Sequence, residues 1–445
     1  MAEVKTRRLE AELEQGRSVL PDTGLLGWQA GEWANLEPVF VRCGETLVWK
    51  NPAFEYRLFF YAADIVPELI HTYSYQNESN WTTYRADLSD FGWKNGPHRF
   101  EQAGYFRVTA RRAQGAQAQP APKTLEDVAA LERGEGGEQP CAAQAWIEEE
   151  AADVCKRVLS RRASGDFTAF ILTDTHYATG CNWPDTLEGV RLCAAGLHPD
   201  AVLHLGDLTD GILPLRYTKR YALRVMDGLR ALGAPFYLCI GNHDANYFRG
   251  NKEYLSNRQC GEFYLGKKTT SYFVDWPENR LRTVFLNSFE PKRRQRYGFG
   301  LRELLLMKRA LLTLPDGWRV LVFSHLPPLA RIHVWSDVIR NEQRILRMLE
   351  SFEEKHKHAV LGWIHGHNHA DQVCEERGIP IISVGCSKTE DFKEHKPDGS
   401  RTFERQPGTR TQELWDVLIV PKDGAGLEFI RFGAGEDRHI LAEGK

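Results

Sequence analysis

The feature that most constrains the fold is the regular alternation of strand-like and helix-like segments after Gly165. The apolar run FTAFILTD predicts a buried strand, and residues 185–197 follow it with helical spacing. The segments AVLHLGD, TKRYALRVMDGLRALG and PFYLCIGNHD then predict a strand, a helix and a strand. Because parallel strands need long crossover connections, this order predicts an α/β domain over residues 165–445.

The sequence before Gly165 has a different residue pattern from the part that follows. A chain of 445 residues is long enough for two domains. Residues 35–112 hold short β-branched and aromatic runs between turn residues, which predicts a small all-β, sandwich-like domain. Residues 1–34 are expected to begin with a short helical pattern and to continue as a loop, and residues 113–164 to form a linker and a helix. The β domain could cap a site, mediate oligomerisation or bind a carbohydrate-like partner.

Composition excludes several classes of partner. The chain has 57 Lys and Arg against 60 Asp and Glu, so it has no excess of positive charge that would attract nucleic acid or an anionic membrane. No run approaches the roughly 20 apolar residues that span a bilayer, and the charged N-terminus does not resemble a secretory signal. Nine scattered cysteines without a CxxC motif indicate reduced thiols and a cytoplasmic location. Homo-oligomerisation remains open.

Polar residues gather where the predicted strands end. The motifs are DTH, GDLTD, GNHD, SHLPP and GHNH, and each follows an apolar run. Taken singly, DxH, GD or HLPP could be an ordinary turn or strand stop. Because ligands of open α/β sheets bind beyond the carboxyl ends of the strands, the five motifs together predict one shared site. The candidate metal ligands are Asp174, His176, Asp207, Asn242, His325, His367 and His369.

This ligand set combines carboxylate, amide and imidazole groups without a thiolate, which suits Mn, Fe or Zn. Seven ligands exceed the needs of one tetrahedral ion, and two ions sharing a bridging carboxylate would use them all. Two such ions, about 3.5–4 Å apart, can clamp the attacking and leaving oxygens of a displacement at phosphorus and supply hydroxide near neutral pH. The pattern therefore predicts a dinuclear metal site.

The series D-x-H, G-D, G-N-H-D, H, G-H-x-H resembles the calcineurin-like metallophosphoesterase superfamily, over about residues 166–435. The resemblance implies a four-layer αββα sandwich with two mixed sheets. It also implies that one ion binds Asp174, His176 and His369, that the other binds Asn242, His325 and His367, and that Asp207 bridges them.

The resemblance further implies that His243 contacts the phosphate and assists the leaving group, with Asp244 orienting the imidazole. Asn242 and His243 are also candidate substrate contacts. Tyr177 and Tyr247 follow ligand motifs and could line the substrate pocket, although packing of their loops would explain them equally well.

One position indicates which branch of the superfamily the sequence resembles. Asp210 stands where purple acid phosphatases carry a tyrosine ligand, and GDLTD looks more like the cyclic-nucleotide phosphodiesterase-like branch. We therefore expect a metal-bound hydroxide to hydrolyse a small-molecule phosphate ester, with a lean towards diesters. A phosphomonoesterase or nucleotidase would use the same site, and a non-catalytic phosphate-binding module is the remote alternative. The motifs leave the natural substrate and the native metal pair open.

Overall fold

The computed structural model describes most of the chain, and the chain divides into two compact units. The first unit extends to Trp146 and the second begins at Ile147. The described residues are 5–19, 21, 26–35, 38–42, 44–62, 88–101, 104–117, 119–133, 142–177, 182–211, 215–247, 253–332, 336–388, 398–406, 408–422, 424 and 426–441.

The first unit contains two β-sheets that share one core. The smaller sheet has the order β1 (Lys5–Arg7), β10 (Ala129–Arg133), β5 (Thr46–Trp49), β8 (His98–Arg99). The larger has the order β2 (Leu13–Val19), β3 (Leu26–Asn35), β9 (Gly104–Arg112), β6 (Phe54–Ala62), β7 (Leu88–Lys94), and β4 (Val39–Val41) pairs with β9. Leu47 and Leu131 of the smaller sheet are buried in the same cluster as Phe54 and Phe106 of the larger, so the sheets pack face to face.

Two predictions for this region are wrong. Residues Leu13–Val19, which lie in the expected helical start, form strand β2 and pair with β3. Residues Ala129–Arg133, which lie in the expected linker, form β10 between β1 and β5. The β10 segment AALER is rich in Ala, Leu and Glu, which favour a helix locally, and pairing with the distant strands β1 and β5 overrides that preference. Strand β2 pairs with the next strand in the chain. The 3-10 helix η3 (Leu125–Asp127) precedes β10.

The second unit contains two six-stranded mixed sheets. The first has the order β13 (Phe236–Leu238), β12 (Ala201–His204), β11 (Phe167–Leu172), β20 (Leu414–Val420), β21 (Leu427–Gly433), β22 (Arg438–Ile440). The second has the order β14 (Tyr272–Trp276), β15 (Leu281–Leu286), β16 (Arg319–Ser324), β17 (Val360–His365), β19 (Ile379–Ser383), β18 (Gln372–Glu376). The pairs from β11 to β13 and from β15 to β19 are parallel, and the outer strands are antiparallel.

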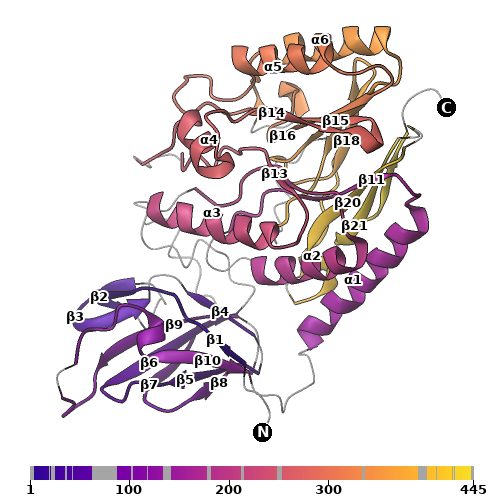
Figure 1. Ribbon diagram of the computed structural model, residues 1–445. Helices are drawn as coiled ribbons and strands as arrows, with labels where there is room; N and C mark the ends of the chain where they lie inside the picture. Colours follow the sequence, from indigo (N-terminus) through magenta and orange to yellow (C-terminus); the bar gives the residue numbers. More distant parts are fainter. Residues whose placement is uncertain are drawn as a thin grey trace. The chain divides into compact units, whose positions relative to one another are not determined.

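Helices cover the outer faces of the two sheets. The helices are α1 (Ala142–Arg161), α2 (Trp183–Leu197), α3 (Leu215–Arg230), α4 (Asn257–Leu265), α5 (Leu301–Leu312) and α6 (Glu342–Lys355), with 3-10 turns η4 (Pro277–Asn279), η5 (Ala330–Ile332) and η7 (Arg410–Gln412). Figure 1 shows α1, α2 and α3 on one side of this unit and α5 and α6 on the other. Ile171 and Leu418 of one sheet share a buried core with Phe285 and Phe323 of the other. The prediction of a mixed α/β fold is confirmed.

This topology brings the predicted motifs to one edge of the sheets. The DTH, GDLTD and GNHD motifs follow the carboxyl ends of β11, β12 and β13, and the SHLPP and GHNH motifs follow those of β16 and β17. Within the described parts of the chain, no helix combines the length and apolar character needed to cross a membrane.

Candidate metal centre

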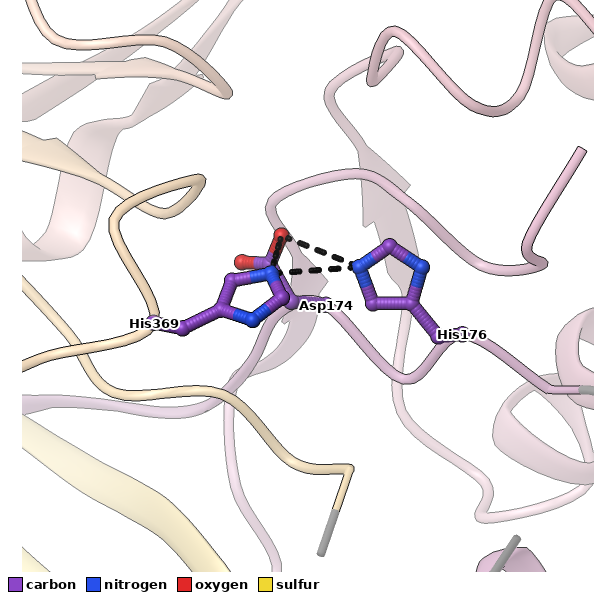
Figure 2. Close-up of side chains that lie close together, drawn as sticks. All are labelled: Asp174, His176 and His369. Carbon is purple, nitrogen blue, oxygen red and sulfur yellow. Dashed lines mark hydrogen bonds and ion pairs between the residues drawn. The ribbon is translucent and has the colours of Figure 1, made fainter. Parts of the chain in front are cut away.

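Three side chains from two strand ends form the first group of candidate ligands. Figure 2 shows the rings of His176 and His369 turned towards the carboxylate of Asp174. The two Nε2 atoms lie 3.2 Å apart, and the Oδ1 atom of Asp174 lies 3.2 Å from that of His369 and 3.7 Å from that of His176. Three possible metal ligands thus converge within 4.8 Å of one another.

A second group lies beside the first. Asp207, His325 and His367 also offer ligand atoms within 4.8 Å of one another. The Nε2 atom of His325 is 3.1 Å from Oδ2 of Asp207 and 3.0 Å from Oδ1 of Asn242. Because Oδ2 of Asp207 is also 3.8 Å from Nε2 of His176, this carboxylate lies between the two groups. The structure therefore brings all seven predicted ligand residues together.

The backbone of these ligands is strained. The φ angles of Asp174, His176, Asp207, His367 and His369 are 50°, 43°, 56°, 67° and 50°. Residues other than glycine rarely adopt this left-handed region, and such strain concentrates at functional sites, where the surrounding structure enforces it. The turns after the strands are therefore shaped to aim these side chains.

Two glycines allow the turns to approach the ligands. A Cβ atom on Gly241 would lie 2.1 Å from Oδ1 of Asp207, and one on Gly366 would lie 2.5 Å from Oδ2 of Asp174. Real Cβ atoms do not come this close to oxygen, so only glycine fits at either position. Each of these glycines opens its motif, GNHD or GHNH, and directly precedes a candidate ligand.

Main-chain carbonyls determine which ring nitrogen carries the proton in two of the imidazoles. The Nδ1 atom of His325 lies 3.0 Å from the carbonyl oxygen of Leu205, and that of His243 lies 2.5 Å from the carbonyl oxygen of Asp210. Because a carbonyl only accepts, each Nδ1 must carry the proton and donate it. The Nε2 lone pair of each neutral ring is then available to a cation or a substrate.

The expectation that Asp244 orients His243 is corrected by the hydrogen bonds. The buried carboxylate of Asp244 accepts from the backbone N–H groups of Asp207 (2.9 Å), Leu208 (2.8 Å) and Gly241 (2.8 Å). These N–H groups belong to turns that leave the strands, so they have no partner in the sheet and a carboxylate satisfies them. Burial and the neighbouring Asp207 raise the pKa of Asp244 to about 7. Asp244 therefore shapes the turns rather than the imidazole.

The charges of the centre favour ionised carboxylates. Burial would raise the pKa of Asp174, but the imidazoles of His369 and His325 outweigh it and hold that pKa well below its usual range. The pKa of Asp207 is likewise lowered, against the effect of burial, chiefly by His325 and His243. Buried anions that converge with imidazole nitrogens and an amide oxygen are the donor set of Mn, Fe or Zn, so the residues fit a metal pair.

The two candidate substrate tyrosines make aromatic contacts. The ring of Tyr177 lies 5.2 Å from that of Tyr221 on α3. The ring of Tyr247 lies 5.4 Å from that of Tyr254, and the guanidinium of Arg296 lies 4.4 Å above it. These contacts account for loop packing, and a contact with substrate stays a prediction for both tyrosines.

Two residues near the centre were missed in the sequence. The ring of Tyr297 lies 5.5 Å from that of His367, edge to face, and Nζ of Lys388 lies 4.0 Å from Oδ1 of Asp210. Lys388 follows the apolar run of β19, so it repeats the pattern of a polar residue after a strand that marked the other motifs. Tyr297 lies in a loop between elements and carries no such signal.

Part of the second unit matches a known protein family. The sequence profile of the family described as Calcineurin-like phosphoesterase matches residues 167–371. A curated protein of Rhodococcus erythropolis, named "Probable cyclic nucleotide phosphodiesterase", is 25% identical over 263 residues, which cover 56% of this chain and 80% of that protein.

Two solved structures are also similar. A dimetal phosphatase from Danio rerio has 20% sequence identity and a TM-score of 0.45, with 62% of this chain and 99% of that chain covered. A purple acid phosphatase from yellow lupin seeds has 11% identity and a TM-score of 0.44, with 92% and 74% covered.

Proposed function

We propose that this chain, whose residues 167–371 match the calcineurin-like phosphoesterase family, hydrolyses a small-molecule phosphodiester with two bound metal ions. The observation that carries the proposal is the position of Asp207: its Oδ2 atom lies 3.1 Å from Nε2 of His325 in the second ligand group and 3.8 Å from Nε2 of His176 in the first. The preference for diesters is supported by the GDLTD motif and by the name of the Rhodococcus relative.

We assign one of the two ligand groups to each metal ion. One ion would be held by Asp174, His176 and His369, the other by Asn242, His325 and His367, and both by Asp207. When bound, Mn, Fe or Zn ions would polarise the phosphoryl group and activate the attacking water.

We assign His243 to the phosphate and to the leaving group. Its Nδ1 proton is held by the carbonyl of Asp210, and its Nε2 atom lies 4.0 Å from Oδ2 of Asp207, so Nε2 faces the centre. In the protonated ring, Nε2–H can donate to a phosphoryl oxygen and pass its proton to the departing alkoxide. Asn242, Tyr177 and Tyr247 remain proposed substrate contacts.

The test replaces the shared carboxylate. We expect Asp207→Asn to lower kcat/KM for an aryl phosphodiester by more than about 100-fold in Mn- or Zn-reconstituted protein, because even outer partners of metal ligands typically contribute about 10–100-fold. Asp200→Asn is the matched control, since Asp200 accepts a backbone N–H from Thr168 at 2.7 Å, at the amino end of β12. Full activity of Asp207→Asn would contradict the proposal.

The same assay separates the alternatives. A wild-type preference for the aryl monoester would favour a phosphomonoesterase or nucleotidase on this site. A metal-loaded protein without turnover on a panel of nucleotides, cyclic nucleotides, phospholipid head groups and sugar phosphates would favour a binding module.

Two further proposals concern the domain limits and the location of the protein. We propose a phosphoesterase domain over residues 165–445 and a separate all-β domain before it, which limited proteolysis with mass spectrometry would test. A cytoplasmic location is supported by the reduced thiols of Cys155, Cys193, Cys239, Cys260 and Cys386. Cell fractionation would test it.

A further inference from the structure

Helix α5 carries apolar side chains on two opposite faces. Leu304 and Leu311 are buried on its inner face. On its outer face, Leu301, Leu305 and Leu312 are 63%, 57% and 74% exposed. Helical periodicity places these three residues, the leucine stripe, in one line about 16 Å long. A surface helix normally presents polar side chains to water, and an exposed apolar patch of this kind marks an interaction site.

Positively charged side chains flank the leucine stripe. By the same periodicity, Arg302 and Arg309 lie on one side of it and Lys308 on the other. The acidic residue of α5, Glu303, is buried and accepts a hydrogen bond from Oγ of Ser271 at 3.0 Å. The outer face of α5 therefore combines leucines with cations and carries no acid.

The leucine stripe ends in a groove of about 970 Å³ between α5 and α6. Figure 1 shows these two helices side by side on the outside of the second unit. Leu312, Trp318 and Phe352 line the groove near the amino ends of β16 and β17, at the opposite edge of the sheet from the metal centre.

The lining of the groove adds positive charge to that of α5. Its described lining includes the acid Asp316 and, besides Lys308, three more exposed cations, Arg344, Lys355 and Lys357. None of the six cations on α5 and around the groove forms an ion pair within the described part of the chain. Their charge is therefore available to an anionic partner.

We propose that the leucine stripe and these six cations dock the protein on an anionic lipid surface. The leucines enter the boundary between head groups and acyl chains, and the cations contact the lipid phosphates and carboxylates. A protein helix bound in the groove would leave Leu301 and Leu305 in water, because they do not line it, whereas a bilayer covers the whole stripe. The balanced charge of the whole chain does not oppose docking, since salt screens exposed charges beyond about 8 Å.

The test measures sedimentation of the full-length protein with lipid vesicles. We expect the partition coefficient to be at least about 10-fold higher for vesicles of phosphatidylcholine and phosphatidylserine, mixed at about 3:1, than for phosphatidylcholine alone. The triple variant Leu301→Gln, Leu305→Gln, Leu312→Gln should lower partition into the mixed vesicles by at least about 10-fold. The triple variant Arg302→Gln, Lys308→Gln, Arg309→Gln should lower it by a similar factor.

Matched controls remove leucines and cations elsewhere on the second unit. Leu159→Gln with Leu223→Gln changes leucines that are 54% and 40% exposed on α1 and α3. Arg191→Gln changes an exposed cation that pairs with Glu188 at 2.7 Å. Both controls should bind the mixed vesicles as the wild type does.

Several outcomes would overturn the proposal. They are equal binding to both kinds of vesicle, binding to neither, and wild-type binding by the leucine variant. Capture of an acidic amphipathic peptide without vesicle binding would replace the lipid with a protein partner. If the leucine variant does not fold, the single variant Leu312→Gln, at the most exposed position of the stripe, carries the same readout. Vesicle binding is measured without an ester, so a failure of the proposed function leaves this test intact.

Discussion

At the scale of single residues, the chemistry depends on which atom of each ring carries a proton. The Nδ1 atom of His243 is occupied by the carbonyl of Asp210, so only Nε2 can exchange a proton with a bound ester. We expect His243→Ala to slow release of an alkyl alcohol from a phosphodiester by about 100-fold or more, and release of nitrophenolate far less, because nitrophenolate leaves without a proton.

The measurement is kcat across a matched series of alkyl and aryl diesters. His439→Ala serves as control, because the side chain of His439 is 46% exposed on β22, where its Nδ1 atom lies 3.7 Å from Oε1 of Glu428. An equal loss for every leaving group would show that His243 acts in binding and gives no proton to the product.

The sequence predicted which residues form the site better than it predicted their hydrogen-bond partners. The strand-end motifs named the side chains that gather around Asp207, because chain order and residue type suffice for that step. The resemblance paired Asp244 with His243, whereas the carboxylate of Asp244 accepts from three backbone N–H groups, because such bonds depend on how turns from different strands meet in space. Tyr297 was missed for the same reason.

At the scale of elements, the centre depends on close contact between neighbouring turns. Gly241 leaves β13 so near to Asp207 that an added methyl group would overlap the carboxylate. We expect Gly241→Ala to weaken Zn²⁺ binding by at least about 10-fold and to destabilise the fold by about 1–3 kcal/mol. Calorimetry and urea unfolding measure the two effects. Gly96→Ala is the control, because no atom lies within 4 Å of its added Cβ, and unchanged metal affinity in Gly241→Ala would contradict this role.

The sequence predicted elements well where pattern and pairing agree. The β-α-β order after Gly165 specified parallel strands, and β11, β12 and β13 follow it. Strand β2 was missed although it pairs with β3, the next strand in the chain. Strand β10 was missed because its residues favour helix locally and are recruited by partners far away in the sequence. Local pattern cannot report such pairing, whereas crossover helices leave a pattern of their own.

At the scale of the whole molecule, a buried acid links elements that are distant in sequence. Glu413, just before β20, is fully buried. Its carboxylate accepts from Nδ2 of Asn182 at 2.7 Å, from Oγ1 of Thr186 at 2.6 Å and from Nε2 of Gln412 at 3.0 Å. Asn182 also donates to the carbonyl of Ser387 at 3.2 Å. The start of α2, the approach to β20 and the loop after β19 thus meet at one carboxyl group.

The carboxyl group of Glu413 makes the free energy of unfolding depend on pH. Burial raises the pKa of Glu413 from 4.5 to about 7, against its hydrogen bonds, so the folded state holds a proton that the unfolded state has released. The contribution to stability is therefore complete below about pH 4 and is lost as pH rises through about 7. A shift of this size, at about 1.4 kcal/mol per unit, corresponds to about 3 kcal/mol.

We expect Glu413→Gln to remove this dependence, because an amide keeps an acceptor for Thr186 and Asn182 and never ionises. Urea unfolding of the metal-free protein at pH 5 and pH 8 measures it: the wild type should lose more free energy of unfolding between the two values than Glu413→Gln, by up to about 3 kcal/mol. Glu436→Gln, whose side chain is 78% exposed, should follow the wild type. Parallel losses in the wild type and Glu413→Gln would mean that Glu413 is already ionised in the fold, and that its three donors outweigh its burial.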